Sequence, residues 1–482
     1  MAEIHQTATV TPTKLELLPE WMAQQRWYAA KGRVPRLRRL WSWRLDDPAG
    51  EVGIETLLVV DESGTDHGHE PVVYQVPLTY RAAPLEGAHH ALVGTMEHSV
   101  LGRRWVYDAP HDPVYARQLL ELVLGRAVPQ AGSQSDTPEP AVVGTPHPSW
   151  TAQGTVRETR VLRGEQSNTS VIYDCVDKHG VAEPLILKVF RTLQAGDNPD
   201  VVVQGALAEA GTTRVPGMVG SISATWPPVT GEEPAHGHLA FAQEFYPGTE
   251  DAWRVALRAV AEGHDFTAEA RDLGAATAEV HALLARALPT AQVSPEAVAQ
   301  TVASMRSRYV AAASEVPAIA AYDHEIAAVF DRAARAPWPV LQRIHGDYHL
   351  GQVLQVPGRG WVLLDFEGEP LRPLAERTLP DLTVRDVAGM LRSFDYAAGS
   401  WEQSHPGGSA RDWAEAAQAA FLDGYAAASG RDPREDADLL TALQLDKALY
   451  EVVYEARNRP TWLTIPTDAV VRLLDEARKA TP

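Results

Sequence analysis

The chain has 482 residues, 45% of them apolar, with 63 acidic and 43 basic side chains and a formal net charge of −20. This length allows two or three domains, and the excess of acidic residues excludes a nucleic-acid binder that depends on a basic face. Cys175 is the only cysteine, which excludes an intramolecular disulfide and a thiolate zinc site. No segment has the pattern of a signal peptide or a membrane span. We therefore expect a cytoplasmic protein with no membrane or nucleic-acid partner.

The first 108 residues are predicted to form a separate β-rich domain. A helix-like segment at 15–27 precedes strand-like runs at 55–60 and 72–78. Apolar runs of this kind, separated by turn-rich segments, are typical of an antiparallel sheet. We therefore expect a twisted antiparallel sheet in this domain.

A second region, 109–247, is predicted to begin with a helix at 114–124. Residues 128–153 follow and are rich in Pro, Ser, Gly and Thr, with almost no apolar periodicity. This composition predicts a flexible linker or a long surface loop.

Two features after the linker indicate an anionic ligand. A turn of small polar residues lies between strand-like segments, where backbone N–H groups and hydroxyls can point at phosphate oxygens; the alternative is an ordinary hairpin turn. Its residues include Ser167, Asn168, Thr169 and Ser170. The next strand, 185–190, is apolar apart from Lys188. A Lys there needs a partner such as the phosphates of ATP, unless it extends to water from an edge strand.

The rest of the chain, 248–482, is predicted to be mostly helical. The strand at 239–245 ends in a Pro-Gly turn, as expected of a hinge between two lobes. Ala-rich segments with helical spacing then cover 252–330, and similar patterns continue at 413–429 and 438–458.

The pattern with most chemical content is His345-Gly346-Asp347 followed by Gln352 and Asp365. Phosphoryl transfer from ATP needs one carboxylate to position the attacking hydroxyl, and an amide oxygen and a second carboxylate to hold the metal that bridges the phosphates. An apolar run leads directly into Asp365, which predicts a buried strand that ends at this carboxylate. The alternative is a polar turn before a core strand.

Together, these segments resemble the protein-kinase-like fold of aminoglycoside phosphotransferases and, more closely, actinobacterial maltokinases. The segments that carry the resemblance are 21–28, 165–170, 186–191, 345–352, 365–370, 386–394 and 454–466. The resemblance covers nearly the whole chain except the linker. It implies an α+β, bilobal protein-kinase-like fold with an N-terminal β-rich cap domain (1–108), an N-lobe-like region (109–247) and a mostly helical C-terminal lobe (248–482).

The resemblance also implies a function. Maltokinases use ATP to phosphorylate maltose at its anomeric hydroxyl, and the maltose 1-phosphate formed feeds α-glucan (glycogen) synthesis from trehalose. Trehalose synthase is the protein partner implied, and ATP and Mg²⁺ are the cofactors implied.

Site roles follow from the same resemblance. Asp347 is expected to be the catalytic residue, and Gln352, Asp365 and Glu367 are expected to hold magnesium through oxygen ligands. Lys188 would bind the α- and β-phosphates. This chain has Val202 where maltokinases have the Glu that steadies this Lys, so Glu209, two helical turns further on, is predicted as the substitute. The backbone at Gln243, Glu244 and Phe245 would hold adenine.

Other residues are predicted to bind the sugar or to support the catalytic loop. The sugar candidates are Lys447, Tyr450, Glu451 and Tyr454 on one helix face, with Trp462, Arg392 and His349. A solvated face of an amphipathic helix is the alternative. His345 and Asp386 are expected to be structural supports.

Several rival functions remain open. A kinase for another sugar, in particular glucosamine, is the first, and a kinase for an aminoglycoside or a choline-like alcohol is more distant. A non-catalytic pseudokinase that acts as a partner of trehalose synthase is the alternative of a different class. Val202 is the one feature that favours it.

Overall fold

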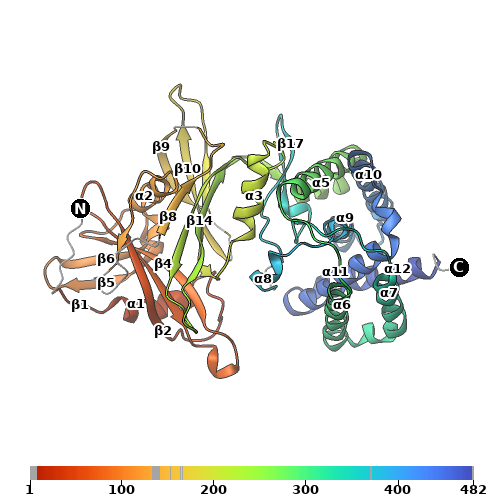
Figure 1. Ribbon diagram of the computed structural model, residues 1–482, viewed down its shortest axis with the longest axis horizontal. Helices are drawn as coiled ribbons and strands as arrows, with labels where there is room; N and C mark the ends of the chain where they lie inside the picture. The colour runs from red at the N-terminus through yellow and green to blue at the C-terminus, as the bar shows by residue number, and fades with distance from the viewer. Residues whose placement is uncertain are drawn as a thin grey trace. The chain divides into compact units, whose positions relative to one another are not determined.

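The computed structural model describes residues 8–132, 142–151, 154–162, 164, 167–369 and 372–479. It divides into two compact units, Met1–Gly205 with Pro216–Pro247 and Ala206–Val215 with Gly248–Pro482. The N-terminal unit is built mainly from strands and the C-terminal unit mainly from helices (Figure 1). This confirms the expected α+β class, with a β-rich N-terminal part and a mostly helical C-terminal part.

The first sheet of the N-terminal unit has eight strands in the order β1-β5-β6-β4-β3-β2-β7, with β12 paired to β4. Its strands are β1 (Val10–Thr11), β2 (Leu37–Leu45), β3 (Gly53–Asp61), β4 (Val72–Arg81), β5 (Leu92–His98), β6 (Gly102–Asp108), β7 (Gln130–Ala131) and β12 (Thr192–Leu193). All pairs are antiparallel, as the sequence predicted. Helix α1 (Lys14–Ala23) begins at a capping box of Thr13 and Glu16 and packs against this sheet.

The second sheet has six strands in the order β8-β13-β14-β11-β10-β9. They are β8 (Val142–Pro146), β9 (Thr155–Val161), β10 (Asn168–Val176), β11 (Leu185–Phe190), β13 (Met218–Trp226) and β14 (Ala235–Glu244). The predicted linker is corrected here, because β8 lies within it and pairs with β13, and β7 pairs with β2. Its remaining segments at 133–141 and 152–153 lie outside the described residues. Helices α2 (Pro113–Val123) and α3 (Pro199–Glu209) complete the elements.

Hydrogen bonds join the two sheets where the chain passes from β11 to β12. Gln75 donates from its backbone N–H to the Arg191 carbonyl (2.8 Å) and from its side chain to the carbonyls of Phe190 and Leu239 (both 2.9 Å). The buried Arg191 guanidinium donates to both oxygens of Asp108 at 2.8 and 2.7 Å. The first sheet is thus held to the second sheet by a buried ion pair and by hydrogen bonds to backbone groups.

The C-terminal unit consists of helices around a small sheet. The helices are α4 (Ala252–Glu262), α5 (Thr267–Ala287), α6 (Pro295–Glu315), α7 (Asp323–Arg335), α8 (Leu374–Arg377), α9 (Thr383–Ser404), α10 (Arg411–Ser429), α11 (Ala437–Asn458) and α12 (Thr464–Lys479). The strands are β15 (Glu250–Asp251), β16 (Val353–Val356) and β17 (Gly360–Leu363), in that order. Helices α5 and α10 approach so closely at Gly274 and Gly424 that an added Cβ would lie within 2.0 Å of a carbonyl oxygen. These two positions therefore require glycine.

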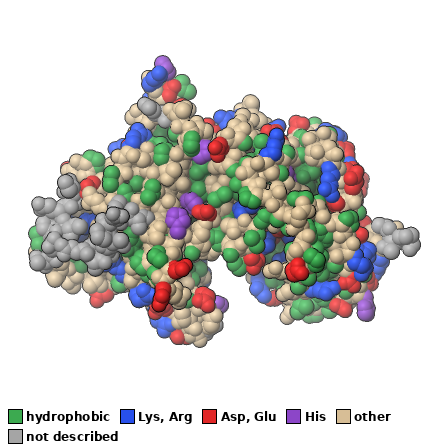
Figure 2. All heavy atoms as spheres, viewed as in Figure 1, with side chains coloured by type: hydrophobic (Ala, Val, Ile, Leu, Met, Phe, Trp, Pro, Cys, Tyr) green, Lys and Arg blue, Asp and Glu red, His purple; other side chains and the backbone are tan. Residues whose placement is uncertain are grey.

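The surface carries charges of both signs. Figure 2 shows basic and acidic side chains interspersed over the visible face of each unit. Among the described residues, no helix combines the length and the apolar character needed to cross a bilayer.

Candidate active site

Asp386 on α9 anchors the loop that carries Asp347 through hydrogen bonds to the loop backbone. The buried Asp386 carboxylate accepts hydrogen bonds from the backbone N–H groups of His345 (2.8 Å) and Gly346 (2.9 Å). His281 Nε2 lies 3.0 Å from the same carboxylate. Burial would raise the pKa of Asp386, but its hydrogen bond with His281 and these neighbours hold the pKa below the usual aspartate value. The loop backbone is therefore fixed by an ionised group.

The same loop is tied to the segment that carries Asp365. His345 Nε2 donates to the Leu364 carbonyl at 2.8 Å, and the Leu364 N–H donates to the Gln352 carbonyl at 2.9 Å. His345 is 2% exposed, and its ring centre lies 4.8 Å from that of Phe366 in a tilted arrangement. The His345 ring connects two backbone segments of the site, and its role as a structural support stays a prediction.

Lys447 on α11 bridges the two carboxylates of Asp347 and Glu369. Its Nζ donates to Asp347 Oδ1 at 3.0 Å and to Glu369 Oε1 at 3.1 Å. Burial would raise the pKa of each carboxyl group, but the Lys447 ammonium outweighs it and holds both pKa values below the usual range. Asp347 is therefore ionised near neutral pH and can accept a hydrogen bond from a substrate hydroxyl.

His349 lies in the field of both aspartates of the site. Burial lowers the pKa of its imidazole, while the carboxylates of Asp347 and Asp365 act in the opposite direction. Its Nδ1 accepts a hydrogen bond from the Gly351 N–H at 3.0 Å. The imidazole is thus neutral, and one of its two nitrogens already accepts a hydrogen bond from the loop backbone.

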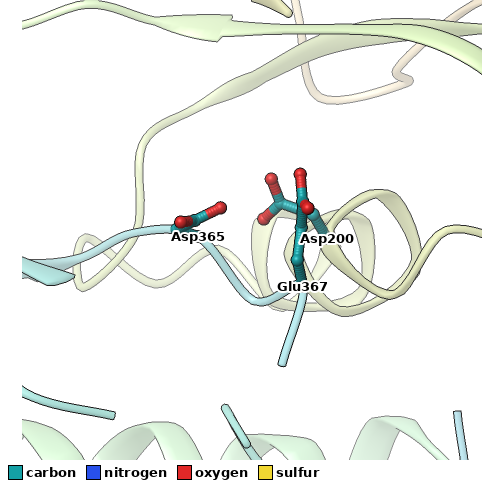
Figure 3. Close-up of side chains that lie close together, drawn as sticks. All are labelled: Asp200, Asp365 and Glu367. Atoms are coloured by element: carbon teal, nitrogen blue, oxygen red, sulfur yellow. The ribbon is translucent and has the colours of Figure 1, made fainter. Parts of the chain in front are cut away.

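The candidate metal ligands Gln352 and Asp365 are in contact. Gln352 Nε2 donates to Asp365 Oδ2 at 3.1 Å, so rotation of the amide would present two oxygens to one cation. Asp365 has a φ of +65°, the one non-glycine residue in the described chain with a positive φ, a conformation that Asp tolerates better than most residues. Glu367 follows on the same loop, and its carboxylate lies within 4.8 Å of that of Asp365 (Figure 3). This oxygen set fits magnesium.

The structure corrects the predicted partner of Lys188. Its Nζ donates to Asp200 Oδ2 at 2.8 Å, and the Asp200 side chain is 1% exposed. Asp200 lies in the first turn of α3 (Figure 3), whereas Glu209 is exposed at the last residue of that helix. The carboxylate is therefore supplied two residues before Val202, and not two helical turns after it.

The polar hairpin residues divide between two faces of the second sheet. Ser170 is opposite Lys188 and Thr169 is opposite Val189 in the β10–β11 register, and neighbouring side chains of a strand face opposite ways. Thr169 Oγ1 accepts from Arg191 Nε at 2.8 Å, on the cap side. Its hydroxyl is thus not available to a phosphate next to Lys188. Ser170 is buried, Asn168 is half-buried and Ser167 is exposed, while Glu165 and Gln166 lie outside the described residues.

The structure restricts the predicted adenine contacts, because two of the backbone N–H groups at 243–245 already have acceptors. The N–H of Glu244 donates to the Gly217 carbonyl at 2.8 Å, and the N–H of Phe245 donates to the Pro184 carbonyl at 2.9 Å. Gln243 lies inside β14, paired on both sides by β11 and β13. The two N–H groups are consumed by the sheet, so they are not open to a base.

The predicted sugar residues are separated by the structure into buried and accessible groups. Arg392 is 1% exposed and donates to Glu451 at 2.7 Å and to Asp395 at 2.5 Å. The prediction that Arg392 and Glu451 bind the sugar is therefore corrected, because the two side chains form a buried ion pair with each other. Tyr450 is half-buried beside Lys447, whose Nζ is 5.0 Å from its ring centre.

At the end of α11 the two remaining aromatic candidates share a cation. The Arg459 guanidinium lies 5.5 Å from the Tyr454 ring centre and 4.6 Å from that of Trp462. Tyr454 is 44% exposed. These rings are brought together, but Arg459 covers them, and no signal in the sequence indicated this contact.

Sequence reasoning missed three charged residues of the site. Asp200 lies in the Asn-Pro-Asp segment that opens α3, and its position directly after a helix-initiating Pro was an available signal. Glu369 and Asp446 face Lys447 and Arg308 from segments far apart in the chain. No spacing rule links such segments.

Comparisons with known proteins agree with this architecture. The family model for the maltokinase N-terminal cap domain matches residues 21–112, and that for the phosphotransferase enzyme family matches residues 158–439. A solved glucosamine kinase in complex with glucosamine, ADP and inorganic phosphate superposes with a TM-score of 0.65 at 23% identity, over 96% of this chain and 100% of that one. The fold is thus the kinase-like fold of that protein.

Two curated relatives are also similar over most of their length. A glucosamine kinase from Streptacidiphilus jiangxiensis is 30% identical over 354 residues, which is 69% of this chain and 77% of that protein. A glucosamine kinase from Mycolicibacterium smegmatis is 30% identical over 351 residues, 68% of this chain and 82% of that protein. The chain belongs to the phosphotransferase enzyme family and carries a maltokinase-type N-terminal cap.

Proposed function

We propose that this protein is a maltokinase that transfers a phosphoryl group from ATP to the anomeric hydroxyl of maltose. The observation that carries the proposal is the ionised Asp347, which is fixed by Asp386 behind the loop and by Lys447 in front of it. The match of the maltokinase cap model to residues 21–112 supports maltose as the acceptor.

The residues divide the work as follows. Asp347 would accept the hydrogen bond of the acceptor hydroxyl and orient its oxygen toward the phosphorus. Lys188, steadied by Asp200, would bind the α- and β-phosphates. Magnesium, held by Gln352, Asp365 and Glu367, would neutralise charge on the phosphate oxygens. The Lys188–Asp200 pair supports an active kinase over a pseudokinase, because the departure at Val202 was the feature that favoured the pseudokinase.

The second candidate is a glucosamine kinase, because the curated relatives at 30% identity carry that name. Purified protein with ATP and magnesium is offered maltose, glucose and glucosamine, and the phosphorylated products are identified. The proposal expects the highest kcat/KM with maltose and phosphate at the anomeric position. Turnover of glucosamine without turnover of maltose would sink the proposal in favour of the second candidate.

The wider setting is part of the same proposal. Maltose 1-phosphate would feed glycogen synthesis from trehalose, with trehalose synthase as the partner that supplies maltose. The lone Cys175, which is buried, is compatible with the reducing cytoplasm.

A further inference from the structure

We propose that Lys447 makes the acceptor site selective for neutral sugars over sugars that carry an ammonium group. The inference rests on the proposed function in one respect, namely that the acceptor hydroxyl lies at Asp347. It deepens that function because it names the charge of the substrate that this site accepts.

The geometry of the three charged groups carries the inference. The Lys447 ammonium lies between Asp347 and Glu369, with Nζ–O distances of 3.0 and 3.1 Å. The side chains of Lys447, Asp347 and Glu369 are 19%, 22% and 14% exposed. Each carboxylate that could attract a cation therefore already has one, and all three groups are only partly open to water.

The surroundings of this triad are also balanced in charge. It lines a cavity of about 20 Å³, which is the size of a single water site. Arg308 and Asp446 line the same cavity, and Arg308 donates to both oxygens of Asp446 at 2.6 and 2.7 Å. Arg385 lies 3.6 Å from Asp446 and 2.8 Å from Asp381. No carboxylate among these described residues is left for a second cation, because Asp386 is bound to the loop and to His281.

The position of the substituent in an amino sugar then decides the selectivity. In a 2-amino sugar, the carbon that carries the ammonium is bonded to the anomeric carbon. When the anomeric hydroxyl is hydrogen-bonded to Asp347, that ammonium lies within a few ångströms of Asp347 and must share its field with Lys447. Two cations at this separation in a partly buried site repel strongly. A neutral hydroxyl at the same carbon escapes this repulsion and can accept a hydrogen bond from Lys447.

Two variants are expected to change the selectivity in opposite directions. Replacement of Lys447 by Met frees two carboxylates, so a cationic sugar gains relative to a neutral one. Glu369→Gln leaves Lys447 with one carboxylate, so the local positive charge increases and the cationic sugar loses further. Lys447→Arg keeps the charge and is expected to keep the preference. A merely structural role of Lys447 predicts no such opposition.

The test measures the affinity of glucose and of glucosamine, which differ in the group at one carbon, by calorimetry and by competition against maltose. Wild-type protein is expected to bind glucose at least about tenfold more tightly than glucosamine. We expect K447M to reduce this ratio about tenfold or more and E369Q to increase it. N-acetylglucosamine, which is neutral but larger, separates charge from size. Arg332→Met removes a cation paired with Asp438 on the same unit and is the matched control, with no change expected.

The outcomes separate this inference from the proposed function. If maltose is phosphorylated but K447M and E369Q shift the glucose-to-glucosamine ratio in the same direction, or not at all, the charge selection is wrong and the maltokinase proposal stands. If maltose is not phosphorylated but the two variants shift the ratio in opposite directions, the charge selection stands and the maltokinase proposal is wrong. Thermal melting of each variant identifies any variant that fails to fold, and E369Q then decides alone by the sign of its shift.

Discussion

The Lys188 ammonium donates to the Asp200 carboxylate at 2.8 Å, and both side chains are largely buried. The two residues come from β11 and from the first turn of α3, so the pair ties the helix to the strand. A carboxylate at this helix turn holds the Lys in one rotamer, so under the proposed function a nucleotide phosphate would meet an ammonium that is already ordered.

Asp200→Asn is therefore expected to weaken the use of ATP. The loss of a charge-assisted hydrogen bond costs about 1.5–3 kcal/mol, which corresponds to a fall of about 10- to 100-fold in kcat/KM for ATP. Steady-state kinetics with ATP as the varied substrate measures this effect. Glu209→Gln changes an exposed carboxylate on the same helix and should leave kcat/KM unchanged. A larger effect of E209Q than of D200N would contradict the assignment of this pair.

Asp347→Asn should leave nucleotide binding intact while turnover is lost. The amide keeps the shape of the carboxylate but cannot hold the acceptor proton, so kcat is expected to fall by about 10²- to 10⁴-fold. Product formation and ADP titration are measured on the same preparation. Asp331→Asn, in an exposed pair with Arg306, is the matched control. Unchanged turnover in D347N would show that another group positions the acceptor.

Asp386→Ala is expected to destabilise the C-terminal unit. The change leaves two backbone N–H groups and His281 without their buried acceptor, which costs about 3–5 kcal/mol. Denaturant unfolding of wild-type and variant protein measures the difference. Because the folded pKa of Asp386 is lowered, its contribution is present above about pH 4 and is lost as the pH falls further. The gap between the two proteins should therefore narrow in acid, and a gap that widens would contradict the role of the ionised carboxylate.

Arg191→Met is expected to loosen the cap from the second sheet. It leaves the buried Asp108 carboxylate without its partner, at a cost of about 3–5 kcal/mol in unfolding free energy. Arg191→Met combined with Asp108→Leu should recover a large part of this loss, since no unpaired charge remains. The exposed pair Arg36–Asp66 serves as the control. A double-mutant cycle on the unfolding free energy is expected to give a coupling energy of about 1 kcal/mol or less for this pair. Equal couplings at the two pairs would refute the interpretation of the buried one.

The sequence was sufficient for those parts of the fold that depend on local pattern. The apolar run at 185–190 coincides with β11, and the expected helix at 438–458 is α11. Asp347, Gln352 and Asp365 could be identified because they lie close together in the chain and their spacing is dictated by the loop and strand between them. Those roles stay predictions until they are tested.

Contacts between segments far apart in the chain could not be predicted from the sequence. Lys447 is 100 residues from Asp347 and 78 from Glu369, and no periodicity relates such positions. Arg392 and Glu451 each lie at a position that a sugar-binding helix face would also use, and only packing shows that they neutralise each other. Strand β8 was missed because its short, Pro- and Gly-containing sequence has the composition of a loop, although its partner β13 fixes it as an edge strand.

Strand β11 and the residue after it present Lys188 to one side and Arg191 to the other, toward α3 and toward the cap respectively. A single-residue deletion between them would point both side chains to the same side of the strand, so one of the two cations would lose its carboxylate partner. The number of residues between Lys188 and Arg191 is thus constrained by both ion pairs.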